Sequence, residues 1–189
     1  MFRVCVFAAL LATAPTLPAQ AGDPYKVAER FSGDWLGTGQ LLIGPRSGLK
    51  FHCELSGDPR ASKIMSFKMK GRCWMGALSA PVYAELRYNS ETDRFYGEFM
   101  DGAEGDGVDI VGAEAPKGIS MRLSRGSVQG NLTAETVNDN QMRAVLSLID
   151  STSKREFPVV AMGFARKEAA AMGLPPYLPD VATGSIGGR

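Results

Sequence analysis

Short runs of alternating apolar and polar residues fill the chain between Trp35 and Arg166. Successive side chains of a β-strand point to opposite faces, so each run predicts a strand with one buried and one solvated face. Glycine, asparagine, aspartate and proline separate the runs, at a spacing typical of all-β domains. The strands are expected at residues 34–43, 49–55, 64–74, 82–88, 94–100, 108–113, 119–124, 128–137, 142–149 and 157–166.

This pattern predicts a single antiparallel up-and-down β-barrel of about ten strands, with a flexible C-terminal tail. A meander of this length either closes into a barrel or folds into a sandwich, and closure is favoured because an open sheet would leave two unpaired edges. Glycines inside several strands ease the curl of a small barrel. A short helix is expected at residues 24–31, with Asp23 as its N-cap and Pro24 in its first turn, at one end of the barrel.

The N-terminus predicts export from the cytoplasm. Arg3 precedes an apolar run at residues 4–11, which is followed by two prolines and the triplet Ala-Gln-Ala. This order is typical of a secretory signal peptide cleaved near Ala21. The run is shorter than the ~20 apolar residues that cross a bilayer, so no membrane span is expected. The expected divisions of this periplasmic or secreted protein are a signal peptide (1–21), a barrel domain (22–166) and a tail (167–189).

Two cysteines remain after the signal peptide, Cys53 and Cys73, and both lie on the predicted buried face. An isolated, even pair in an oxidising compartment is most simply a disulfide. A tight hairpin at residues 57–59 would separate the two by far more than the ~7 Å between Cα atoms that a bridge allows. We therefore expect a disulfide, offset strands and a wide loop at residues 56–64. The lone histidine, His52, is expected on the solvated face, and with two thiols it forms an incomplete zinc site.

No catalytic constellation is evident, so the protein is expected not to be an enzyme and no cofactor is expected. No serine lies in a Gly-x-Ser-x-Gly turn, and His52 has no nearby nucleophile except Cys53. Three glutamates fall on the predicted outer face: Glu85, Glu98 and Glu135. The acidic, glycine-rich residues 101–109 lack the spacing of a helix-flanked calcium loop, so a solvated bend is favoured there over a cation site.

The net charge and the composition of the C-terminal residues indicate which partners are expected. The formal net charge is +1, which gives no electrostatic case for nucleic acid or an anionic membrane. Beyond Arg166 the chain is rich in proline and glycine, which predicts the flexible tail. The alternative is an extended docking segment for an envelope protein, around Tyr177 and Leu178.

The predicted inner face is the most informative surface for function, because it carries almost no charge. A barrel of about eight strands is just filled by side chains or holds one small ligand, and ten strands leave more room. A small apolar ligand would suit such an interior, since methionines adapt to its shape. The candidate ligand-binding residues are Trp35, Phe51, Phe67, Met69, Phe99, Met121 and Leu132. The alternative is that these side chains pack together and fill the barrel.

The helix followed by Gly33-x-Trp35, the meander, and Arg166 at the end of the last strand resemble the lipocalin and calycin superfamily, including its ten-stranded bacterial members. The resemblance implies that Trp35 closes one end of the barrel with Arg166 stacked on it. It also implies a secreted binding protein for a small apolar ligand. Ten-stranded relatives that bind haem use a late histidine, whereas His52 is early, so haem is not expected. The alternative is a filled barrel that acts through its surface, as an envelope-associated interaction protein or an inhibitor of secreted enzymes.

Overall fold

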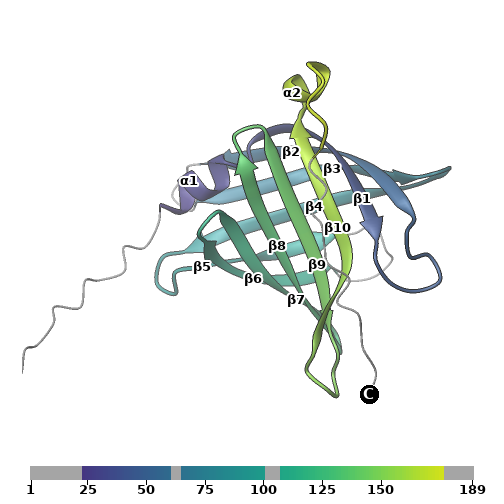
Figure 1. Cartoon of the computed structure of the whole chain (residues 1–189). Coiled ribbons are helices and arrows are strands. Elements are labelled where there is room, and N and C mark those ends of the chain that lie inside the picture. The colour runs from purple at the N-terminus through teal and green to yellow at the C-terminus, as the bar shows by residue number, and fades with distance from the viewer. Residues whose placement is uncertain (1–22, 61–64, 101–106, 177–189) are drawn as a thin grey trace, which may run out of the picture.

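Ten β-strands form a closed barrel in which each strand is antiparallel to its neighbours in the sequence, and the first strand pairs with the last (Figure 1). This computed structural model describes residues 23–60, 65–100 and 107–176. The strands are β1 (Gly33–Leu41), β2 (Lys50–Arg60), β3 (Ser66–Met75), β4 (Leu78–Asn89), β5 (Arg94–Met100), β6 (Val108–Ala115), β7 (Gly118–Arg125), β8 (Val128–Asn138), β9 (Gln141–Ile149) and β10 (Glu156–Arg166). The predicted fold class is confirmed.

Strand β7 illustrates how the alternating sequence builds the barrel. Ile119, Met121 and Leu123 are buried in the interior, whereas Ser120 and Arg122 are exposed. This period of two is the geometric signature of a strand with one wet face. The same alternation, repeated around the closed sheet, turns the apolar side chains inward.

The hairpin of β2 and β3 is longer than predicted. Cys53 lies directly opposite Cys73 and forms a disulfide with it, with 4.1 Å between the Cα atoms. The predicted bridge is therefore confirmed, together with the offset of the strands. The predicted wide loop at residues 56–64 is wrong, because residues 56–60 pair with β3 on one side and, through Gly57, with β1 on the other. Pairing with β3 along its whole length, and with β1 at Ser56 and Gly57, holds this segment in the sheet.

Helix α1 (Pro24–Glu29) covers one end of the barrel (Figure 1). Its N-cap is Asp23, whose carboxylate accepts a hydrogen bond of 3.0 Å from the Tyr25 backbone N–H. Val27 and Ala28 are buried against the barrel interior. The predicted cap and helix are confirmed, although the helix ends at Glu29.

Trp35 and Arg166 close the same end, as the resemblance to lipocalins implied. Trp35 is 1% exposed, and its Nε1–H donates to the Phe31 carbonyl at 3.1 Å. The Arg166 guanidinium lies 4.5 Å from the centre of the Trp35 ring. The same guanidinium donates to the carbonyls of Ser32, at 2.7 Å, and Asp139, at 2.6 Å. One arginine thus joins the chain before β1, the end of β10 and the β8–β9 turn.

Gly33 explains the first residue of the Gly-x-Trp pattern. Its φ is +85°, in the left-handed region that favours glycine. A Cβ atom at this position would lie 2.9 Å from Arg166 Nη1. The glycine therefore provides both the chain reversal before β1 and the space for the arginine that covers Trp35.

The first part of the expected tail packs on the barrel instead of extending from it. Helix α2 (Lys167–Ala171) follows β10 directly and contacts β1 and β10. The Gln141 side-chain amide then donates to the Pro175 carbonyl at 2.9 Å. The signal peptide (1–21) and the proposed docking segment in 177–189 lie outside the described residues. Among the residues that the structure describes, none belongs to a helix long and apolar enough to cross a membrane.

The Arg166→Lys variant should lower the free energy of unfolding by roughly 1–3 kcal/mol, because an ammonium loses the planar stacking and the forked donation to two carbonyls. Urea denaturation followed by circular dichroism would measure this. Arg94→Lys, an exposed site at the same end, is the matched control and should change stability by less than about 0.5 kcal/mol. Equal effects of the two substitutions would contradict a closing role for Arg166.

Removing the disulfide by the double substitution Cys53→Ala and Cys73→Ala should lower the free energy of unfolding by roughly 3 kcal/mol, the loop-entropy value for this separation of 20 residues. Alanine is chosen because serine would place hydroxyls on the apolar interior. Urea denaturation of the variant and of oxidised wild-type protein provides the comparison. A loss below about 1 kcal/mol would show that the bridge constrains the unfolded chain far less than this.

Candidate functional site

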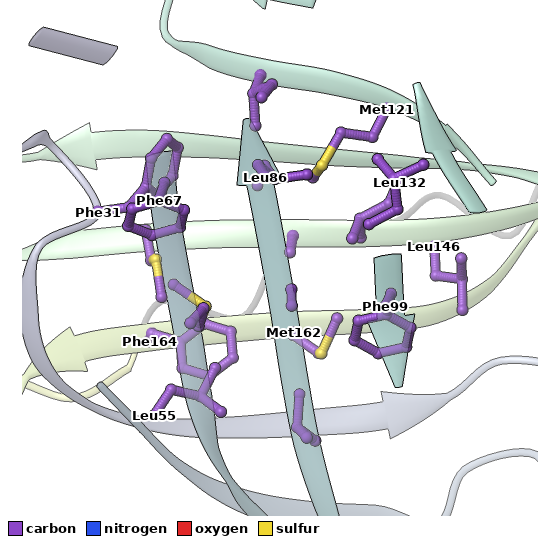
Figure 2. A pocket seen from close by; sticks show the side chains of 18 of the residues that line it. Phe31, Leu55, Phe67, Leu86, Phe99, Met121, Leu132, Leu146, Met162 and Phe164 are labelled. Carbon is purple, nitrogen blue, oxygen red and sulfur yellow. The ribbon is translucent and has the colours of Figure 1, made fainter. Parts of the chain in front are cut away.

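The barrel interior contains a cavity of about 180 Å³. Its lining comes from α1, from the connection after it, and from every strand except β1. Figure 2 shows Phe99, Leu132 and Met162 pointing from three strands into a common space. The cavity is therefore formed by the barrel as a whole and exists only because the sheet is closed.

Every residue that lines this cavity in the described part of the chain is apolar. Phenylalanines and branched aliphatic side chains form most of the wall, and four methionines complete it: Met69, Met121, Met142 and Met162. The Cys53–Cys73 disulfide also lies in the wall. Because no side chain here offers a charge or a strong hydrogen-bonding group, a polar ligand would be desolvated without compensation.

Two glycines in β1 explain why this strand contributes no side chain to the lining. A Cβ atom on Gly37 would overlap with the Phe164 ring, and one on Gly39 would overlap with the Phe51 ring. Both rings occupy the space that side chains on β1 would otherwise take. Phe164 thereby becomes part of the cavity wall.

Five of the seven predicted ligand-binding residues line the cavity: Phe67, Met69, Phe99, Met121 and Leu132. Trp35 and Phe51 do not line it. Trp35 lies beneath Arg166 at the closed end, and Phe51 lies against Gly39 toward the opposite end. Alternation indicates which face a side chain occupies, but it does not give the height of that side chain along the barrel axis.

The sequence reasoning missed the contributions of the first helix and the last strand. Val27, Ala28 and Phe31 line the cavity from the α1 end, and Met162 and Phe164 line it from β10. The helix was expected to plug or border one end of the barrel, but none of its residues was named as lining. In β10 both faces are apolar, and the register shifts between Pro158 and Val160, so the alternation carried no usable signal.

The outer face carries charged groups that serve the sheet. Glu85 Oε2 accepts a 2.6 Å hydrogen bond from the Tyr83 hydroxyl and lies 3.1 Å from Lys68 Nζ, across the β3–β4 pair. Arg87 Nη2 lies 3.2 Å from Glu85 Oε1. The hydrogen bonds from Tyr83 and then from Lys68 lower the pKa of Glu85 to about 2. None of these groups lines the cavity.

The remaining candidate sites of the sequence also lie outside the cavity. His52 is exposed, as predicted, and stands opposite Trp74 on the outer face of β2 and β3. Most of the acidic stretch at 101–109 falls outside the described residues. Over the three ranges of the chain that the structure describes, no three His, Cys, Asp or Glu side chains are grouped so as to hold a metal ion.

No model of a known protein family matches this sequence, and no curated protein shows significant similarity to it. The class that the structure defines is a closed, ten-stranded antiparallel β-barrel with an apolar interior. Any functional argument therefore rests on the geometry of the barrel itself.

The acid dependence of stability should reflect Glu85. A carboxyl whose pKa is depressed in the folded state stabilises that state above its unfolded pKa, ~4.3, and this contribution is lost as the pH falls toward about 2. Between pH ~4.3 and about 2, the free energy of unfolding should therefore fall further in the wild-type protein than in the Glu85→Gln variant. Urea denaturation at a series of pH values measures the difference. Glu91→Gln, in the exposed β4–β5 turn, is the control and should keep the wild-type profile; identical profiles for all three proteins would refute the assignment to Glu85.

Proposed function

We propose that the protein binds a small apolar molecule inside its barrel and acts as a lipocalin-like binding protein. The observation that carries the proposal is the cavity of about 180 Å³ with its wholly apolar lining. An engineered apolar cavity of about 150 Å³ stays dry and binds benzene or xenon. A cavity of this composition favours an apolar occupant over water, because water inside it would lack hydrogen-bond partners.

The volume also limits the size of the ligand. Pockets for drug-sized ligands measure about 300–1,000 Å³, which is well above the volume of this cavity. The expected ligand is compact, of the order of a single aromatic ring with small substituents, and uncharged. The methionines of the wall favour an aromatic ligand in particular, since thioether sulfur makes favourable contacts with ring edges.

Two further features support a binding role. The Trp35–Arg166 closure is the one that the resemblance to lipocalins implied. The disulfide fits the periplasmic or secreted location that the N-terminal sequence indicates. We infer binding rather than catalysis because, among the described residues, the cavity wall has no titratable side chain and no nucleophile.

The cavity methionines provide a direct test. Neither Trp35 nor Trp74 lines the cavity, so tryptophan fluorescence is a poor reporter. With ¹³C-methyl-labelled methionine, toluene should shift the methyl signals of the four lining methionines in a saturable manner. The signals of exposed Met100 and Met172 should stay unchanged. Native mass spectrometry of protein recovered from its producing cells would then detect the natural ligand as additional mass.

A filled-cavity variant sharpens this test. Ala84→Leu adds volume to a residue that lines the cavity, whereas Ala113→Leu adds the same volume to a residue that does not. Ala84→Leu should abolish the toluene response while Ala113→Leu preserves it. Uniform shifts in all methionines, or a response that survives Ala84→Leu unchanged, would contradict binding in the cavity and favour a filled barrel that acts through its surface.

A further inference from the structure

Large apolar side chains are exposed at the end of the barrel that lies opposite α1. Five of them lie at or beside the hairpin connections of this end: Ile43 (44% exposed), Leu49 (45%), Leu78 (63%), Met100 (48%) and Val128 (55%). Scattered exposed apolar residues are common, but a concentration of them at one end indicates an interaction surface. The pattern is unusual for hairpin tips, which are mostly polar.

The topology places two of these hairpins side by side. In an up-and-down barrel every second connection lies at the same end, so β1–β2 and β9–β10 share this end. Because β1 pairs with β10, the two hairpins are neighbours, and the Leu42 N–H donates to the Val159 carbonyl at 2.9 Å. In Figure 1 both hairpins extend away from α1.

Basic residues accompany the apolar ones on these two hairpins. We call this surface the hairpin rim and define it by six exposed residues: Ile43, Arg46, Leu49, Lys50, Lys154 and Arg155. No ion pair in the described part of the chain includes any of its four cations.

The carboxylates near the hairpin rim accept hydrogen bonds from other groups of the protein. Asp150 accepts backbone hydrogen bonds from Thr152 and Ser153 within its turn and faces Lys154, and Glu156 accepts from the Asn131 amide. Asp101, Glu104 and Asp106 belong to the β5–β6 connection, outside the described residues. Within the two hairpins, residues 42–50 and 150–156, four cations therefore stand against two carboxylates.

We propose that the hairpin rim docks onto the surface of a lipid bilayer that contains anionic phospholipids. Apolar tips flanked by cations match the boundary between acyl chains and anionic headgroups, where the apolar groups insert and the cations lie at headgroup level. A water-insoluble ligand of the kind proposed above resides in lipid, so docking would bring the barrel to the source of its ligand. The docking itself does not depend on the cavity being occupied.

Charge and apolar contact should both contribute to binding. Each Lys or Arg near an anionic membrane surface strengthens binding by about fivefold, and this contribution weakens as salt is added. Loss of two cations should therefore weaken binding by about 25-fold, and their reversal to glutamate by more. Loss of the apolar tips should weaken binding in a way that salt does not change.

Vesicle flotation tests the proposal. Wild-type protein should float with vesicles of phosphatidylcholine and phosphatidylglycerol, and far less with phosphatidylcholine alone. Lys154→Glu with Arg155→Glu should weaken flotation by at least about 25-fold. The matched control, Arg94→Glu with Lys117→Glu, reverses two exposed cations at the α1 end and should change binding by less than about twofold, since that end lies beyond the screening length.

A second pair of variants tests the apolar tips. Ile43→Ser with Leu49→Ser should reduce flotation at high salt, while Met172→Ser, at an 82% exposed residue beside α2, should not. The methionine response to toluene reports folding and cavity binding independently in every variant. All variants carry the same N-terminus, so any contribution of that segment to vesicle binding cancels when the variants are compared.

The two proposals can fail separately. Absence of flotation with anionic vesicles, or equal losses in rim and control variants, would overturn docking by the hairpin rim and leave the toluene result untouched. Flotation that depends on the rim in a protein without any toluene response would support docking and refute the cavity proposal.

Discussion

The pairing of β1 with β10 is the constraint on which the rest of this structure depends. It satisfies the backbone groups of the two strands that would otherwise be open edges, and it converts an apolar sheet face into an enclosed interior. The Trp35–Arg166 pair lies at this seam, directly opposite one another in the register. The stacking and the carbonyl contacts of Arg166 attach the chain before β1 to the closed sheet, which fixes α1 over the same end.

The cavity results from the way side chains fill the interior of the closed barrel. The rings of Phe31 and Phe67 lie 6.3 Å apart near the α1 end, and Phe164 and Phe51 occupy the space left by glycines in β1. The interior between them is not filled completely, and the residues described in its wall include no polar side chain. Charged groups are instead placed outside, where Lys68–Glu85 and Arg143–Glu135 link neighbouring strands. This division between an apolar interior and a charged exterior is the basis of the binding proposal.

Much of the fold could be predicted from the sequence, because period-two alternation is a local signal that every strand repeats. The disulfide could also be predicted, since Cys53 and Cys73 share one face. The alternation could not give those features that depend on where a residue lies in three dimensions. One such feature is the height of Trp35 and Phe51 along the barrel axis. Another is the burial of β10 on both faces. Both depend on α1, α2 and the barrel shear, which no local pattern gives. The length of β2 depends on its pairing partners in β1 and β3, and these are known only once the strand register of the closed barrel is known.

The central claim is that the closed barrel keeps an unfilled apolar cavity, and xenon binding tests it most directly. Xenon enters dry apolar cavities of this size without requiring hydrogen bonds. A crystal of the protein under xenon pressure should show a xenon atom inside the barrel, in contact with Met69, Phe99 and Leu132. A crystal structure in which these side chains meet across the interior and exclude xenon would contradict the account.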